Sequence, residues 1–119
     1  MINLDTHILI HALTGNLRTK ERQILSTRPW GISSIVLWEI AKLRQLGRVE
    51  MDLKATEFRT AMDAIHVFPI SLDVARVSTE LDFKGDPADE IIASTSIVYE
   101  VPLLTRDRMI RKSKLVEFL

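Results

Sequence analysis

The chain has 119 residues, 46% of them hydrophobic, and no cysteine. This predicts one domain with its own core and excludes disulfides and thiolate metal sites. Sixteen basic and sixteen acidic residues give a formal net charge of zero, so any binding of nucleic acid has to be local. There is no basic N-terminal region with a long apolar run and no stretch of about 20 apolar residues, which predicts a soluble, cytoplasmic protein.

Short apolar segments alternate with helical patterns along the whole length, which predicts βα units around a parallel sheet. Strands are expected near 1–4, 31–33, 66–70 and 102–105, with a further edge strand near 114–118. Helices are expected near 7–13, 18–27, 34–46, 54–64, 73–82 and 87–99. None of the breaks between them is long enough to link two domains, so residues 1–119 are expected to form a single α/β domain.

Acidic residues follow the first and the last of the main predicted strands. Residues 1–4 run directly into Asp5, and residues 101–105 lead to Asp107 after one Arg. Ligands of open parallel sheets bind at the carboxyl edge of the strands. We therefore expect Asp5 and Asp107 to lie at a functional edge.

The helix predicted at 34–46 carries an acid among apolar side chains. Four apolar residues at helical spacing form one stripe, Val36, Ile40, Leu43 and Leu46. Glu39 falls inside this stripe and is expected to point toward the core. A carboxylate there is costly unless it is paired, hydrogen bonded or bound to a metal, although a salt bridge or a position at the rim would also explain it.

The helix predicted at 87–99 begins with a cluster of acids. Asp86 suits the N-cap, Pro87 the first helical position, and Asp89 the capping-box position. Helix capping therefore explains Asp86 structurally, and the alternative is a role in the outer shell of a site. The buried, small-residue-rich helix that follows would carry Asp89 to the carboxyl edge of the sheet.

Four segments occur in the order of the motifs of PIN-domain proteins. They are Leu4-Asp5-Thr6-His7, Ile32 to Ile40 with Gly47-Arg48, Gly85 to Asp89 before Ile91-Ile92-Ala93, and Pro102 to Asp107. Phe68-Pro69-Ile70 and the helix after it fit the family's middle strand and helix. The chain resembles this family over most of its length, and it looks most like the VapC-type toxins of toxin–antitoxin pairs.

The resemblance implies an α/β/α sandwich around a mostly parallel sheet of four to five strands. It also implies a magnesium- or manganese-dependent endoribonuclease that acts as a toxin and is restrained by a cognate antitoxin. The family's acidic metal-binding and catalytic positions match Asp5, Glu39, Asp89 and Asp107. Thr105 matches the small hydroxyl residue beside the last acid, and Thr6 and Asp86 would support the site. Glu90 departs from the basic residue that is common in relatives.

The chemistry of the residues agrees with this resemblance. Carboxylates and water hold hard cations such as magnesium, and the metal activates water for attack on a phosphodiester. The sequence leaves open whether one or two ions bind. His7 and His11 are spaced as zinc ligands could be, but there is no cysteine and no third well-placed histidine.

Basic residues cluster around and after Asp107, and they are either a solvated face or contacts to RNA phosphates. They are Arg106, Arg108, Arg111, Lys112 and Lys114. Trp38 lies off the apolar stripe of its helix and suits either ordinary helix packing or an interface, which together with the toxin resemblance leads us to expect a homodimer.

Three other classes fit parts of the pattern. A receiver-like signalling module has the same size, but it needs an acidic cluster after the first strand and a lysine at the last strand end. A phosphatase would want a second acid two residues after Asp5, where His7 stands. A degenerate PIN-like fold that only binds RNA or protein would not need the full set of acids.

Overall fold

The structure is a computed structural model that describes residues 1–119. A four-stranded sheet crosses its middle, with the strands in the order β3-β2-β1-β4. The strands are β1 (Ile2–Leu4), β2 (Trp30–Ser33), β3 (His66–Phe68) and β4 (Leu103–Leu104). All neighbouring strands are parallel. The predicted α/β class with a parallel sheet is confirmed.

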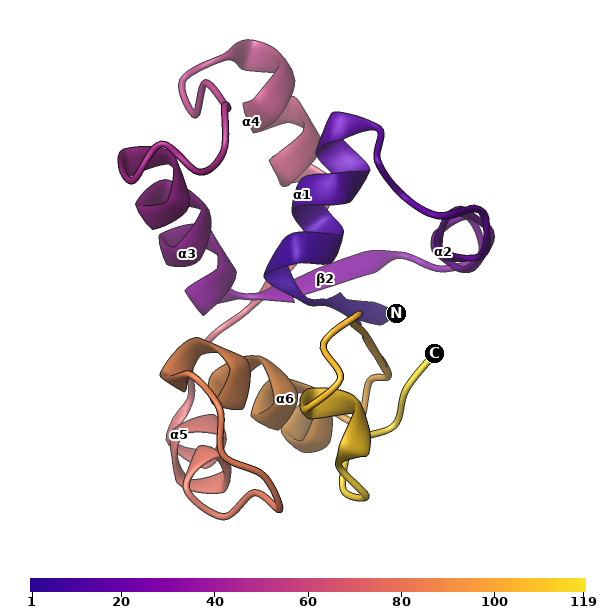
Figure 1. Ribbon diagram of the computed structural model, residues 1–119, viewed down its shortest axis with the longest axis vertical. Helices are drawn as coiled ribbons and strands as arrows, with labels where there is room; N and C mark the ends of the chain where they lie inside the picture. The colour runs from indigo at the N-terminus through magenta and orange to yellow at the C-terminus, as the bar shows by residue number, and fades with distance from the viewer.

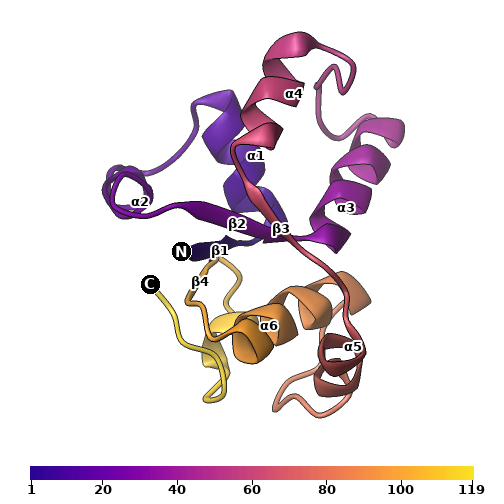
Figure 2. The same cartoon turned by 180° about the vertical axis from the view of Figure 1, so that it is seen from behind.

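Helices cover both faces of the sheet (Figures 1 and 2). On one face lie α1 (Thr6–Thr14), α3 (Ser34–Gln45) and α4 (Thr56–Asp63). On the other face lie α5 (Leu72–Ser78) and α6 (Pro87–Tyr99), and the short 3-10 helix η1 (Ile110–Lys112) follows β4. The seven-residue α2 (Thr19–Leu25) precedes β2 at the end of the sheet where that strand begins.

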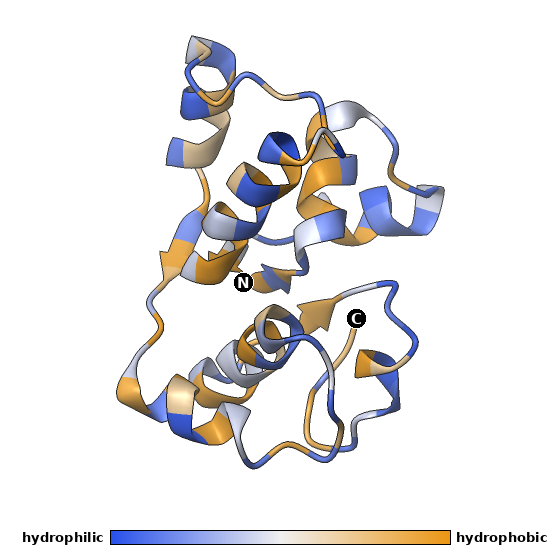
Figure 3. Ribbon diagram, turned by 60° about the vertical axis from the view of Figure 1, so that its left-hand side comes forward, coloured by the Kyte–Doolittle hydropathy of each residue, from blue (hydrophilic) through white to orange (hydrophobic).

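The core lies between the sheet and the two helical layers. Ile2 and Leu4 of β1 are fully buried, and so is Ile92 of α6. Figure 3 shows the apolar strands inside and the polar turns of the helices outside. A strand covered on both faces has no solvent side, and this explains why the predicted strands contain so few polar residues.

Gly31 of β2 leaves space for the ring of Phe68 on the neighbouring strand β3. A Cβ at this position would lie 2.6 Å from the ring of Phe68, nearer than real side chains come. Pro69 follows Phe68 and cannot donate to a ladder, so β3 ends at Phe68 and not at residue 70 as predicted.

The predicted edge strand at 114–118 is wrong as a strand, because only Phe118 forms a bridge, parallel to Leu103. The Asp82 carboxylate accepts from the Ser113 hydroxyl at 2.6 Å and from the Lys114 N–H at 2.7 Å. These bonds hold the start of the segment away from the sheet. Only its end reaches β4, where the Leu119 N–H donates to the Leu103 carbonyl at 3.1 Å.

Several helix bounds also differ from the prediction. The apolar stripe of α3 stops at Leu43, because Leu46 is the C-cap residue and is 56% exposed. The next helix, α4, begins at Thr56, and α5 ends at Ser78, four residues earlier than predicted. No helix in the structure combines the length and the apolar content needed to cross a membrane.

Candidate acidic site at the carboxyl edge of the sheet

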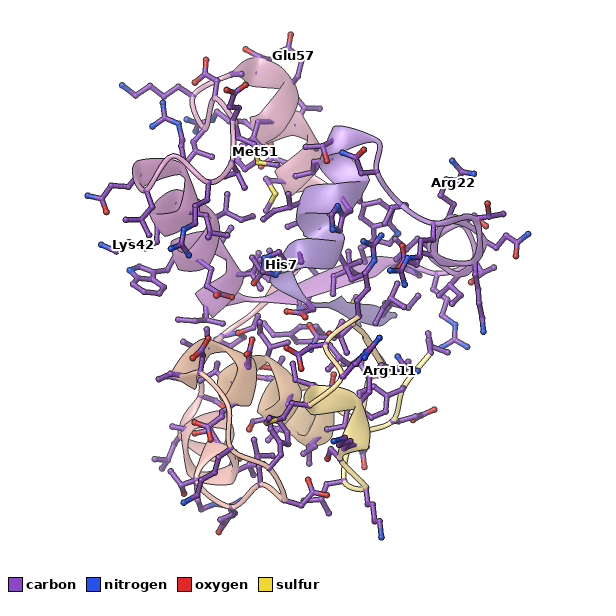
Figure 4. The ribbon with its side chains drawn as sticks, viewed as in Figure 1. His7, Arg22, Lys42, Met51, Glu57 and Arg111 are labelled. Carbon is purple, nitrogen blue, oxygen red and sulfur yellow. The ribbon has the colours of Figure 1, made fainter.

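The four predicted acids come together from four separate elements. Asp5 follows β1, Glu39 lies on α3, Asp89 lies in the first turn of α6, and Asp107 follows β4. They line an open hollow of about 400 Å³ that has no hydrophobic residue in its wall. The other wall residues are His7, His11, Asp86 and Arg106. His7, labelled in Figure 4, stands on the first turn of α1.

Asp5 is the most deeply buried of these acids. Its side chain is the N-cap of α1 and accepts from the Thr6 N–H at 2.8 Å through Oδ1. Its other oxygen accepts from the Thr105 hydroxyl at 2.6 Å. Burial raises the pKa of Asp5, and the hydrogen bonds from Thr105 and Thr6 act against that rise. Both oxygens are therefore held in fixed directions.

Glu39 lies half-buried on the flank of α3 and accepts a hydrogen bond from the Thr6 hydroxyl. The prediction that it points toward the core is wrong, because Val36 and Ile40 fill the core side of this helix. Burial raises the pKa of Glu39, the Thr6 bond lowers it, and the nearby Asp5 carboxylate raises it further. Thr6 thus bonds to two of the four acids.

Asp89 has no hydrogen-bond partner in the protein, unlike the other three acids. Burial raises its pKa to about 7, and the carboxylates of Asp5, Asp107, Glu39 and Asp86 act in the same direction. A strongly perturbed acid in a polar hollow is the pattern that functional sites show. The predicted capping-box bond of Asp89 is absent, so this side chain has no local structural role.

Asp86 occupies the N-cap position of α6, but its side chain makes no cap hydrogen bond. The structural explanation predicted for its carboxylate is therefore wrong. Pro87 at the start of the helix has no N–H, so one of the donors left unpaired at a helix start is absent. The Asp86 side chain instead lines the hollow.

Asp107 follows β4 and lies at the start of the next turn. Its Oδ1 accepts from the N–H groups of Met109 at 2.8 Å and Ile110 at 3.0 Å. Its own N–H donates to the Thr105 hydroxyl at 3.0 Å. Because that hydroxyl also donates to Asp5, Thr105 joins the two acids that follow β1 and β4.

Hard divalent cations fit this donor set. No three acidic or histidine side chains converge closely enough in this structure to surround an ion directly. Mg²⁺, however, binds through one or two carboxylates and keeps several waters. Asp5, Glu39 and Asp89 all have raised pKa values, and Asp89 has free oxygens, so a cation would relieve the repulsion among them.

The basic cluster divides into structural and free side chains. Arg106 forms a two-pronged ion pair with Glu21, with both N–O distances at 2.7 Å. Arg111 donates to the Thr105 carbonyl at 3.2 Å and lies over the Phe118 ring, next to the C-terminal segment (Figure 4). Arg108, Lys112 and Lys114 are exposed and make no ion pair, so their side chains remain free to contact a ligand.

Two polar residues near the site were missed by the sequence analysis. Glu21 is 7% exposed, and the ion pair with Arg106 lowers its pKa to about 2. Asn3 is fully buried in the middle of β1 and donates to α6 at Ile92 and Ser96. A polar residue inside an apolar strand was the available signal for Asn3, whereas nothing in the sequence pairs Glu21 with an arginine 85 residues away.

Comparison with known proteins agrees with this geometry. The model of the PIN domain family matches residues 2–114. A toxin–antitoxin complex from Klebsiella pneumoniae is similar at 26% identity and a TM-score of 0.69, over 90% of this chain and 87% of that chain. VapBC2 from Rickettsia felis, solved with a promoter DNA fragment, has 20% identity and a TM-score of 0.71, over 100% and 98%.

FitAcB from Neisseria gonorrhoeae is also similar in fold, at 17% identity and a TM-score of 0.69, over 100% of this chain and 97% of that chain. A search of curated protein sequences found no match. The match to the family model spans nearly the whole chain. The chain belongs to the PIN domain family.

Proposed function

We propose that this protein is a divalent-metal-dependent endoribonuclease and the toxin of a toxin–antitoxin pair. The observation that carries the proposal is the meeting of Asp5, Glu39, Asp89 and Asp107 in one polar hollow. Membership of the PIN domain family supports it, and so does the likeness to solved toxin–antitoxin complexes. The same membership removes the receiver-like and phosphatase alternatives.

Each group of side chains would have its own role. Asp5, Asp89, Asp107 and Glu39 would hold Mg²⁺ or Mn²⁺, whose chemistry when bound is to activate water and to neutralise charge on a phosphate. Thr6 and Thr105 keep the carboxylate oxygens in position through the bonds described above. The exposed Arg108 and Lys112 would contact the phosphates of RNA beyond the hollow.

The exposed apolar surface supports a homodimer. Leu37 and Trp38 of α3 are 42% and 57% exposed, and Leu72 of α5 is 85% exposed. Trp38 therefore does not serve internal helix packing, and an aromatic anchor of this kind suits an interface. Light scattering should detect a dimer that Trp38→Ala weakens. A stable monomer at high concentration, unchanged by the substitution, would remove the dimer from the proposal.

The antitoxin is the second proposed partner. A solved structure similar in fold is a toxin–antitoxin complex, and a ribonuclease toxin has to be restrained in the cell that makes it. Co-expression with the product of a neighbouring small gene should yield a stable complex and restore growth. A toxin that arrests growth equally with and without that product would have another partner.

Substitution of the acids tests the proposed activity. Expression of the wild-type protein should arrest growth, and the purified protein should cleave RNA with Mg²⁺ or Mn²⁺. Asp5→Asn and Asp107→Asn should reduce cleavage by more than about 100-fold, because direct ligands matter more than the outer-shell groups that cost 10–100-fold. Circular dichroism should show both variants folded.

Asp73→Asn is the matched control, since Asp73 is an exposed acid of α5 outside the hollow. It should cleave RNA as the wild type does. If Asp5→Asn and Asp107→Asn do the same at equal abundance, the acids do not form the site. A folded wild type that binds RNA but does not cleave it with either metal would indicate the degenerate, non-catalytic alternative.

A further inference from the structure

Asn3 is a buried polar residue in an otherwise apolar part of the sheet. It lies in the middle of β1, is fully buried, and its amide donates to the Ile92 carbonyl at 3.1 Å and to the Ser96 hydroxyl at 3.0 Å. Its own Oδ1 is buried and has no hydrogen-bond partner. An unpaired buried acceptor destabilises a fold, so stability alone does not explain an asparagine here.

The partners of Asn3 do not need it for their own hydrogen bonds. The hydroxyls of Ser94 and Thr95 donate back to the helix carbonyls of Glu90 and Ile91 at 2.7 and 2.8 Å. Ser96 lies four residues after Ile92, the same spacing as in those two bonds. Without Asn3, its hydroxyl would therefore have the Ile92 carbonyl as a partner. An apolar side chain in place of Asn3 would therefore leave few polar groups of α6 unsatisfied.

The position of Asn3 relates it to two of the acids. Side chains alternate along a strand, so Asn3 and Asp5 face the same side of the sheet, the side covered by α6. Asp5 lies two residues further on, about 6.6 Å along the strand. Because α6 leads into the parallel strand β4, it runs opposite to β1.

The same reasoning places Asp89 level with Asp5. Asp89 precedes Ile92 by three residues and Ser96 by seven, which is about 4.5 to 10.5 Å along the helix. The distance from Asn3 to Asp5 along the strand, about 6.6 Å, falls within this range. The two bonds of Asn3 thus connect β1 and α6 at one level, and Asp5 and Asp89 meet at the next.

From this geometry we propose that Asn3 is a positioning residue, whose amide sets the height of α6 on the sheet and thereby the separation of Asp5 and Asp89. This inference rests on the proposed metal-dependent function. The other contacts between α6 and the sheet include Ile92 and Ala93, which are buried and apolar. Apolar packing has no direction and tolerates small shifts, whereas hydrogen bonds from a buried amide fix one register.

The test separates metal affinity from stability. Asn3→Leu removes both bonds and the unpaired acceptor while keeping the number and branching of the side-chain heavy atoms. We expect the melting temperature of the metal-free protein to stay the same or rise. The affinity for Mn²⁺, measured by titration calorimetry, should fall about 10–100-fold, the range for residues that orient metal ligands. RNA cleavage at limiting Mn²⁺ should fall with it and recover in part at high Mn²⁺.

Thr95→Val is the matched control. It removes a buried hydroxyl of the same helix whose hydrogen bond stays within that helix. Its Mn²⁺ affinity should equal that of the wild type whatever its stability. Ser96→Ala removes only one of the two partners and should weaken Mn²⁺ binding less than Asn3→Leu. Added to Asn3→Leu, it should weaken binding no further.

The outcomes distinguish the two proposals. If the wild type binds no Mn²⁺, the proposed function fails and this inference fails with it. If the wild type binds Mn²⁺ and Asn3→Leu binds it equally well, only the positioning role is overturned. Equal weakening by Thr95→Val would show a general effect of altering α6 and would also overturn it. Should Asn3→Leu fail to fold, Ser96→Ala decides the matter, because unchanged affinity there rejects the role.

Discussion

Two buried or half-buried carboxylates in this protein have opposite surroundings. Glu21 of α2 is held by both prongs of Arg106 at 2.7 Å, and its pKa falls to about 2. Asp89 of α6 has no partner and faces other acids, and burial with that repulsion raises its pKa to about 7. Arg106, which pairs with Glu21, lies directly before Asp107, one of the acids that raise the pKa of Asp89.

The difference shows which carboxylate serves the fold and which serves a site. A paired acid favours the folded state as an anion, whereas an unpaired acid among like charges opposes it. An unpaired acid of this kind is retained where function needs it, at a cost in stability. In the metal-free protein, the ion pair of Glu21 therefore stabilises the domain while the Asp89 cluster destabilises it.

Breaking the ion pair should have the largest effect on stability. Glu21→Gln should lower the free energy of unfolding by about 3 kcal/mol. This is the low end of the range for a buried pair, and it applies here because the Arg106 side chain is still 25% exposed. Urea denaturation measures this directly. The exposed Glu57 of α4, substituted by Gln, should change stability by less than about 0.5 kcal/mol. Equal effects of the two substitutions would mean that the pair does not support the fold.

Filling the acidic hollow with a cation should have the next largest effect. Mn²⁺ at about 100 times its dissociation constant should stabilise the wild type by about 2.7 kcal/mol near neutral pH. Glu21→Gln should keep this increment, whereas Asp5→Asn should lose most of it. Melting curves with Mn²⁺ and with a chelator measure the increment. A wild-type melting temperature that is indifferent to Mn²⁺ and Mg²⁺ would contradict a shared acidic metal site.

The two carboxylates also predict a stability maximum in mildly acidic solution. The pKa of Glu21 falls from 4.5 to about 2, so its contribution is present above 4.5 and is lost as the pH drops toward 2. The pKa of Asp89 rises from 3.8 to about 7, so its contribution is full below 3.8 and is lost as the pH rises through 7. The metal-free protein should be most stable at about pH 4 to 5.

Asp89→Asn tests the alkaline side of that profile. An amide does not titrate, so the loss of stability between about pH 5 and 8 should become smaller. At pH 8 the variant should exceed the wild type by on the order of 1 kcal/mol, a modest value because water screens a half-exposed carboxylate. Thermal melting in chelator at several pH values measures both. A variant less stable than the wild type at pH 8 would show that Asp89 has an unseen partner.

Asp86 should give the smallest effect, although it lies only three residues from Asp89. Its side chain makes no cap bond, so Asp86→Asn and Asp86→Ala should each change stability by less than about 0.5 kcal/mol. An N-cap whose side chain bonds would instead cost about 1 kcal/mol on change to Ala. Asp86→Asn should also retain most RNA cleavage. Loss of cleavage equal to that of Asp89→Asn would place Asp86 among the direct metal ligands.

Much of this protein follows from local sequence patterns. Apolar runs ending in Asp5 and Asp107 indicated parallel strands with acids at one edge, because residues after such strands share that edge. The order of the motifs indicated the PIN domain family, which the family model confirms. The hydroxyls of Thr6 and Thr105 were expected to support the acids, and each bonds to a predicted acid.

Only the tertiary structure decided which polar groups meet. Glu39 follows the helical period of apolar residues, yet it turns to Thr6 at the flank of α3, since Val36 and Ile40 already fill the core side. Arg106 was predicted for RNA and is held by Glu21 from another element. Periodicity determines the face on which a side chain lies, but pairing across 85 residues depends on how helices settle on the sheet, and local sequence does not contain that information.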